Sequence, residues 1–425
     1  MSAEFRSAAE IHSVNPRESS PVVIPEQYKI DPDPDLRKLL IKNIEETCQI
    51  IPDCEDKPSL VDNVFNEEGE WILKGEDKYP DFYELPPFQV RNVLREELAS
   101  VYRLVNYRLR EDKYPDGYNG HDQSHIRVVS ERTESLLRLA GQKEGVIALG
   151  IAAAEGHDLG NVKVRKGHSL ESPAILVNVV PSVLNSPGKW GSVETAIKLH
   201  DEKAIGKEIH EWESETIYDD VQKLRELGPL VNALIIADKT DMGRHRTNLW
   251  ATSLQVLERD THAFVNFFGE SKGLDLTTDE KGNKRLTWRI GYSPDVLEEE
   301  YKRFGALARK RKFGEGVAAL VPQWLQDLNK QGRSNHFDGW WQEFMHIYND
   351  RIELTALNAF ALFPTLKYFR VEAKDQVDSV DPEVGMSKKE TYSLDLFEKH
   401  RKQREAKYFP KAERPGRGQN GDHQV

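Results

Sequence analysis

An apolar, alanine-rich stretch that ends in a histidine and an aspartate constrains this sequence more than any other feature. Residues 146–156 read VIALGIAAAEG, and His157 and Asp158 follow directly. An unbroken run of small and aliphatic residues is typical of a helix that is buried on most sides. Two polar side chains at the end of such a helix lose their water, which costs free energy unless they bind something. Because histidine and carboxylate are common metal ligands, the pair predicts a metal site.

Helical periodicity dominates the middle of the chain, so we expect a mainly α fold. Residues 88–109 are the clearest case, because valines and leucines recur every three or four positions along one face. The same periodicity predicts further helices at about 35–48, 124–141, 143–156, 171–185, 192–203, 214–227 and 228–240.

The pattern changes after residue 260. Residues 273–292 contain two β-favouring runs around the polar sequence DEKGNK at 279–284, which predicts a β-hairpin. Helices at about 294–312, 316–330 and 338–362 and a short strand at 365–371 should follow. We therefore expect a small α+β appendage packed on the helical core.

Four segments follow from these patterns. Residues 1–85 are rich in proline and acidic residues and should form an irregular extension with one helix. Residues 86–260 should form the helical metal-binding domain, and residues 261–373 the α+β appendage. Residues 374–425 are polar and end in a Lys- and Arg-rich sequence, which is typical of a disordered tail.

Composition narrows the class of protein. The 425 residues carry a formal net charge of -12, which argues against a general nucleic-acid scaffold. No apolar run approaches the ~20 residues that span a bilayer, and the N-terminus lacks a signal segment. Cys48 and Cys54 are too few for a disulfide framework, so we expect two ordinary thiols. These features predict a cytoplasmic protein without membrane association or specific nucleic-acid binding, and they leave a homo-oligomer open.

Other side chains that bind metals stand at the ends of the neighbouring predicted helices. His125 and His168 open helices, whereas His200 and Asp238 end them. One histidine at a helix end is weak evidence, because such residues often only cap the helix. Five segments with the same arrangement, in the order His, His-Asp, His, His, Asp, predict a shared metal site.

This order resembles that of the HD-domain superfamily of metal-dependent phosphohydrolases over residues 118–245. His157-Asp158 resembles the namesake doublet, His125 the first metal histidine and Asp238 the terminal aspartate. His168 and His200 resemble the additional histidines of the binuclear subgroup. The resemblance implies an HD-type helical bundle core that holds two divalent transition metal ions. Its six ligands would be His125, His157, Asp158, His168, His200 and Asp238, a set without thiolate that suits Fe, Mn, Zn, Ni or Co.

The resemblance also implies a mechanism. Asp158 would bridge the two metals, and a hydroxide bridging them would attack phosphorus. His121 lies four residues before His125 and resembles the general acid of many phosphodiesterases in the superfamily. Lys239 is a second candidate for protonating the leaving oxygen. Asp158, His121 and Lys239 are therefore the candidate catalytic residues.

Basic residues beside the ligands are candidates for binding phosphate. Lys163, Arg165 and Lys166 lie in the short loop between Asp158 and His168, and Arg244 follows the last ligand. Two features depart from the relatives. Asn161 occupies a position where many relatives carry lysine, and the GYP signature of cyclic-di-GMP phosphodiesterases is absent after His200.

Neighbouring polar residues are candidates for orienting the histidines or facing the pocket. Asp201 and Glu202 follow His200 and are candidates for orienting the histidines, and Lys239 and Arg244 are candidates for facing the pocket. Asp241, His245 and Arg246 also follow Asp238 closely, but the sequence assigns them no role.

The predicted function is hydrolysis of a phosphomonoester or phosphodiester, with a phosphorylated small molecule or nucleotide as substrate. The six-ligand order also resembles mixed-valent di-iron oxygenases on the HD scaffold, so oxygen chemistry is an alternative. Deoxynucleotide triphosphohydrolysis is another, because His-Asp-Leu-Gly followed closely by a histidine resembles that branch. A nucleotide-binding module without catalysis is the non-enzymatic alternative, and the complete ligand set argues against it.

Overall fold

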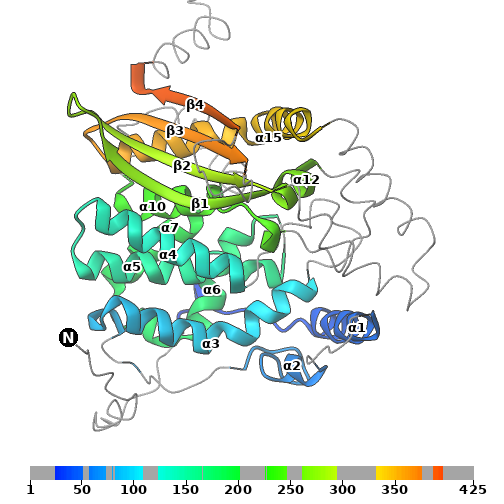
Figure 1. Cartoon of the computed structure of the whole chain (residues 1–425). Helices are drawn as coiled ribbons and strands as arrows, with labels where there is room; N and C mark the ends of the chain where they lie inside the picture. Colours follow the sequence, from blue (N-terminus) through cyan, green and yellow to red (C-terminus); the bar gives the residue numbers. More distant parts are fainter. Residues whose placement is uncertain are drawn as a thin grey trace, which may run out of the picture.

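The mainly α fold with a small α+β part is confirmed by a computed structural model of the chain (Figure 1). It describes residues 24–50, 57–72, 79, 82–108, 123–164, 166–201, 225, 227–246, 261–293, 332–375 and 386–395. The helices that surround the site are α3 (Pro87–Arg108), α4 (Gln123–Leu139), α5 (Glu144–Gly156), α6 (His168–Val179), α7 (Pro187–Leu199) and α10 (Pro229–Lys239).

The alanine-rich helix α5 lies at the centre of the helical part. It contacts α3, α4, α7 and α10, and every residue from Gly150 to Gly156 is buried. Neighbouring leucines pack closely on both ends of this stretch, because an added Cβ at Gly150 would lie 2.3 Å from Leu137 Cδ1, and one at Gly156 would lie 2.7 Å from Leu176 Cδ2. The sequence of small residues thus permits the close helix packing that buries His157 and Asp158.

Two helices from the N-terminal region border this core. Helix α1 (Pro34–Ile50) packs on α3 and buries Leu36, Leu40 and Ile44, as the sequence predicts for residues 35–48. The short helix α2 (Ser59–Asp62) and the one-turn helices η2 (Glu26–Tyr28) and η3 (Phe82–Glu84) complete the described part of this region.

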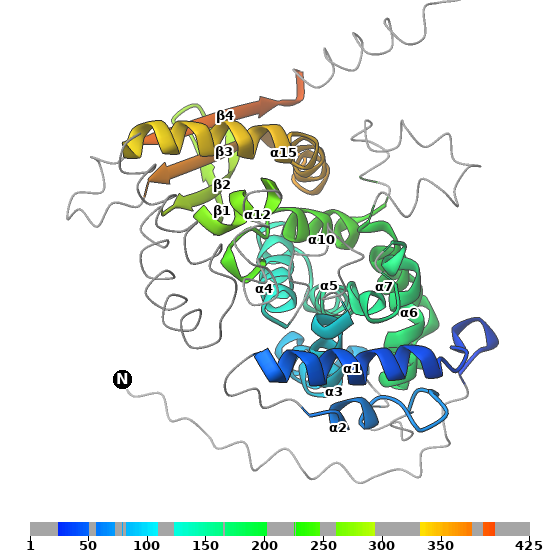
Figure 2. The same ribbon diagram turned by 90° about the vertical axis from the view of Figure 1, so that its right-hand side faces the viewer.

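Beyond α12 (Thr261–Phe268) lies a four-stranded sheet, as Figures 1 and 2 show. Its strands are β1 (Gly269–Thr278), β2 (Lys284–Tyr292), β3 (Leu366–Asp375) and β4 (Ser387–Ser393), in the order β1-β2-β3-β4. β1 and β2 form the predicted hairpin, closed by Asp279, whose carboxylate accepts hydrogen bonds from the backbone N–H groups of Lys281 and Asn283. β2 and β3 are parallel, which requires the crossover connection that contains α15 (Arg333–Leu362).

Helix α15 covers one face of the sheet with aromatic side chains. Trp288 and Tyr292 on β2 contact Phe344 and Trp340 on α15, with ring centroids 5.7 and 5.2 Å apart. Helix α10 carries Asp238 and packs on both α4 and α15. It therefore joins the helical part of the fold to the part that contains the sheet, as Figure 2 shows. The sheet is therefore part of the frame that positions the last predicted ligand.

The structure corrects three expectations. Residues 387–393, predicted to belong to a disordered tail, form β4, which pairs antiparallel with β3. The helix expected at 171–185 is α6, which begins at His168, and a separate one-turn helix η5 (Pro181–Asn185), because Pro181 cannot continue the hydrogen-bond ladder. Cys48 is disulfide-bonded, so the expectation of two thiols is wrong, and the cytoplasmic location stays a prediction.

Other expectations lie outside the described residues. These are the helices at 294–312 and 316–330 and most of the helix at 214–227. Among the residues that the structure describes, none of the helices combines the length and apolar character needed to cross a membrane.

Candidate metal centre

Each of the six predicted ligands stands at or near a helix end. His125 lies in the first turn of α4 and His168 is the first residue of α6. His157 and His200 are the C-cap residues of α5 and α7, and Asp238 lies in the last turn of α10. Asp158 follows His157 and caps the one-turn helix η4 (Leu159–Val162). All six residues are at most 9% exposed, as expected for side chains that share one buried centre.

Asp158 joins these side chains into one cluster. Its Oδ2 lies 3.3 Å from His125 Nε2 and 3.4 Å from His157 Nε2. Its Oδ1 lies 2.9 Å from His168 Nε2 and 3.6 Å from His200 Nε2. The two carboxylate oxygens thus face two different pairs of histidines.

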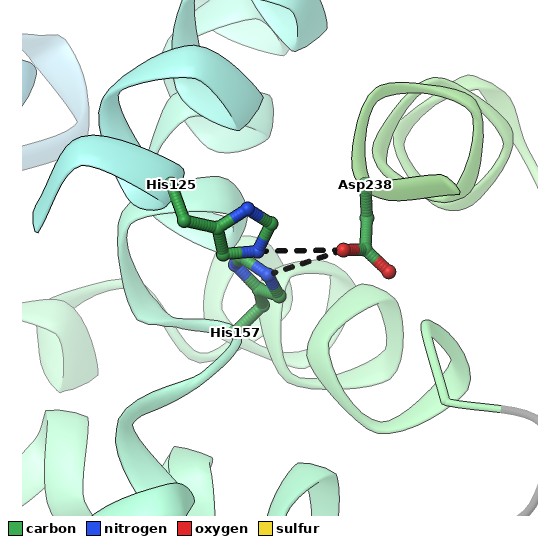
Figure 3. Close-up of side chains that lie close together, drawn as sticks. All are labelled: His125, His157 and Asp238. Atoms are coloured by element: carbon green, nitrogen blue, oxygen red, sulfur yellow. Dashed lines mark ion pairs between the residues drawn. The ribbon is translucent and has the colours of Figure 1, made fainter. Parts of the chain in front are cut away.

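Asp238 closes the Oδ2 side of the cluster. Its Oδ1 lies 3.4 Å from His125 Nε2 and 4.0 Å from His157 Nε2, and Figure 3 shows both rings turned toward this carboxylate. His125, His157 and Asp238 offer ligand atoms within 4.8 Å of one another, as do His157, Asp158 and His200. Either group can hold a metal ion, and His157 belongs to both.

The tautomers of two histidines fit a bound cation. His157 Nδ1 donates to the Ala154 carbonyl at 2.8 Å, and His200 Nδ1 donates to the Ile197 carbonyl at 2.6 Å. In each neutral ring the Nε2 atom then carries a lone pair. His157 Nε2 is buried, has no hydrogen-bond partner among the described residues, and faces the Asp158 and Asp238 carboxylates. A lone pair that faces carboxylate oxygens is repulsive unless a cation lies between them.

The protonation states of His157 and His125 also favour a cation in the cluster. Burial lowers the pKa of His157 to about 3, so this ring is neutral. Burial and Arg246 act to lower the pKa of His125, but the carboxylates of Asp158, Asp238 and Asp241 outweigh them and raise it to about 10. In the metal-free protein a proton on His125 therefore occupies part of the place that these carboxylates offer to a metal cation.

A buried carboxylate orients His125 from behind. Asp241 Oδ2 lies 2.6 Å from His125 Nδ1, and both Asp241 oxygens contact His245 Nε2, at 3.1 and 3.0 Å. Burial acts to raise the pKa of Asp241, but the hydrogen bonds from His125 and His245 hold it well below its usual value. Asp201 stands behind His168 in the same way, with Oδ2 3.5 Å from Nδ1. Asp201 therefore lies where the sequence predicts it, whereas Glu202 lies outside the described residues.

Asp158 is held by its own turn and by α6. Asn161 Nδ2 donates to the Asp158 carbonyl and to Oδ1, both at 3.0 Å. The Gly160 N–H donates to Ser172 Oγ, whose single O–H lies within hydrogen-bonding distance of two carbonyl acceptors, those of His157 at 2.7 Å and His168 at 2.9 Å. An added Cβ at Gly160 would lie 2.0 Å from the His168 carbonyl oxygen, so only glycine allows this approach. These contacts fix the doublet relative to His168.

The other predicted catalytic residues and the predicted phosphate-binding residues lie in different environments, and some lie outside the described residues. Lys239 Nζ donates to Asp238 Oδ2 at 2.9 Å, so an ammonium group lies beside the centre. Lys163 Nζ pairs with Glu171 at 2.7 Å, and Lys166 is exposed. His121, Arg165 and the side chain of Arg244 lie outside the described part of the chain.

Comparisons with known proteins add no assignment, since no family model, curated protein or solved structure matches this chain. The buried cluster of histidine and aspartate is compatible with an HD-type site, and its geometry is the basis for a functional proposal.

Proposed function

We propose that this protein is a binuclear metal-dependent phosphohydrolase of the HD type. One observation carries the proposal: the two oxygens of Asp158 face separate histidine pairs, His125 and His157 on one side and His168 and His200 on the other. A carboxylate placed in this way is suited to bridge two metal ions. Asp238 adds a terminal carboxylate on the Oδ2 side.

The donor set matches divalent transition metals, because imidazole and carboxylate bind Fe, Mn, Zn, Ni and Co. Two such ions, when bound, lower the pKa of water from about 15.7 to about 7 and stabilise charge on phosphoryl oxygens. The outer contacts of Asp241 and Asp201 keep the ligating nitrogens of His125 and His168 turned toward the centre.

Lys239 is the described residue best placed to act on the leaving group. Its side chain is 17% exposed and its Nζ lies 2.9 Å from Asp238. An ammonium group in this position can hydrogen-bond to the leaving oxygen and donate a proton to it as the phosphorus–oxygen bond breaks. His121 remains the second candidate for this proton transfer.

The test is metal analysis followed by a substrate screen. The full-length protein is purified without added chelator and incubated with phosphomonoesters, nucleotides and cyclic dinucleotides, and the hydrolysis products are identified by chromatography, since a cleaved diester releases no inorganic phosphate. We expect hydrolysis of at least one class, and we expect Asp158→Asn to lower its rate by about 1000-fold or more. Asp275→Asn is the matched control, because Asp275 is a half-exposed aspartate on β1. Metal-loaded protein that hydrolyses none of these substrates contradicts the proposal.

The same experiment separates the main alternative. A di-iron oxygenase built on these ligands consumes dioxygen when the iron-loaded protein is reduced and given substrate. We expect no substrate-dependent dioxygen uptake. Uptake without hydrolysis of any phosphoester would assign the centre to oxygenase chemistry instead.

A further inference from the structure

A buried arginine beside the centre is not accounted for by the metal ligands or their hydrogen-bonding partners. Arg246 ends the one-turn helix η7 (Arg244–Arg246), which contacts α4 and α12. The residue is 6% exposed, yet its Nη1 has no hydrogen-bond partner among the described residues. Burying an arginine with an unsatisfied donor costs free energy, so such a group is expected to have an anionic ligand.

Asp241 does not supply that partner. Arg246 Nη1 lies 3.9 Å from Asp241 Oδ2, beyond hydrogen-bonding distance, and this oxygen already accepts from His125 Nδ1 at 2.6 Å. The other Asp241 oxygen is shared with Arg132 Nη1 at 3.7 Å and with His245 Nε2 at 3.1 Å. One carboxylate therefore stands among two arginines and two histidines, so Asp241 alone does not neutralise both guanidinium groups.

Arg246 lies close to the candidate metal centre. Its Nη1 approaches the same Asp241 oxygen that His125 contacts, so only one carboxylate separates the guanidinium from a predicted metal ligand. The backbone holds it there, since the Arg246 N–H donates to the Gly243 carbonyl at 2.9 Å and the Met242 carbonyl accepts from Ser271 of β1 at 2.8 Å. A group bound by Arg246 would thus lie near the centre but would not itself coordinate the metals.

We propose that Arg246 binds a second phosphate group of the substrate, separate from the phosphate that is hydrolysed. Guanidinium offers two parallel N–H donors that match phosphate oxygens, which lysine does not. This inference rests on the proposed phosphohydrolase function and narrows it to substrates with at least two phosphates. The basic loop after Asp158 is a weaker candidate, because Lys163 is already paired with Glu171.

The experiment measures equilibrium binding of four probes to the full-length, metal-loaded protein by calorimetry. Inorganic phosphate is the reference for inorganic triphosphate, and adenosine monophosphate is the reference for adenosine 3′,5′-bisphosphate. The first pair tests a contiguous polyphosphate and the second tests two phosphates on one ribose. The variants are Arg246→Gln and, as a matched control, Arg289→Gln, because Arg289 is a half-exposed arginine on β2.

We expect triphosphate or the bisphosphate to bind wild type about 10-fold more tightly than its reference. Arg246→Gln should remove that difference, while the affinity for the reference should change less than about 2-fold. Arg289→Gln should leave all four affinities unchanged. The proposal is overturned if neither probe is preferred, if the preference survives in Arg246→Gln, or if this variant weakens probe and reference equally. Since no turnover is measured, a protein that hydrolyses nothing yet shows this preference would retain the anion site and lose only the proposed hydrolysis.

A structure of wild-type protein with the preferred probe decides the case if Arg246→Gln does not fold. A phosphate within hydrogen-bonding distance of Arg246 Nη1 supports the proposal, and phosphates located only elsewhere overturn it.

Discussion

Asp241 Oδ2 lies 2.6 Å from His125 Nδ1, and this buried contact fixes which ring nitrogen of His125 faces the centre. We expect Asp241→Asn to weaken metal binding by about 10- to 100-fold, because the partner that orients and polarises a ligating histidine is lost. Asp201→Asn serves as the comparison. Asp201 is 3.5 Å from His168 Nδ1 and more exposed than Asp241, so its loss should cost less. Titration with a chelator measures both affinities, and equal losses would contradict this ranking.

Asn161 donates to both the carbonyl and Oδ1 of Asp158, the oxygen that faces His168 and His200. Asn161→Ala should therefore release that side of the carboxylate and lower metal content toward one ion per chain. Asn178→Ala is a matched control, since Asn178 is also buried and its Nδ2 donates to two carbonyls, those of Tyr28 and Ala174, away from the ligands. Elemental analysis should show full metal content in Asn178→Ala, and the same loss in both variants would argue against a specific role for Asn161.

Gly160 allows the turn after Asp158 to lie against α6. An added Cβ would meet the His168 backbone at 2.0 Å, so Gly160→Ala should lower the free energy of unfolding by about 2–3 kcal/mol. An added Cβ at Gly188, in α7, meets nothing within 4 Å, so Gly188→Ala should be neutral or stabilise by up to about 1 kcal/mol. Urea unfolding measures both values. A Gly160→Ala protein as stable as wild type would show that the contact between η4 and α6 is loose.

His336 should make the sheet region sensitive to acid. Burial lowers the pKa of His336 in the folded protein to about 4, below its ordinary value of 6.5. Between these two pH values the His336 side chain binds more protons in the unfolded chain than in the folded protein. The contribution of His336 to the free energy of unfolding is therefore fully present above about pH 6.5 and is lost as the pH falls toward 4. His336→Gln should reduce this loss in thermal melts taken from pH 7 to pH 4.5, whereas His346→Gln, at an exposed position of the same helix, should behave like wild type. Identical pH profiles for wild type and His336→Gln would exclude the assignment.

The six candidate ligands could be picked out from the sequence because each lies where an apolar helical pattern begins or ends. The helices pack around the buried helix α5, and their ends therefore lie close together. This packing brings the side chains at those ends to the single carboxylate of Asp158. Residues that act through another residue were harder to assign. Asp241 and His245 follow the last ligand in sequence, but only the fold shows that both contact each other and that Asp241 reaches His125.

Strand β4 was missed for a physical reason. Its sequence SKKETYS alternates poorly and is rich in charge, and an edge strand of this composition gains its place from backbone pairing with β3. The expectation for Lys163 illustrates a second limit. Its pairing with Glu171 depends on the turn between η4 and α6, and neither residue signals this contact in the sequence.

The number of metal ions bound per chain tests the central claim most directly. Elemental analysis of the full-length protein should give two divalent transition metal ions per chain, because the Oδ1 and Oδ2 sides of Asp158 each face a separate histidine pair. Asp158→Ala should retain neither the metals nor the activity, since it removes the only carboxylate that both sides share among the described residues. Two metals and full activity in Asp158→Ala, or no stoichiometric metal in the wild-type protein, would contradict the binuclear centre.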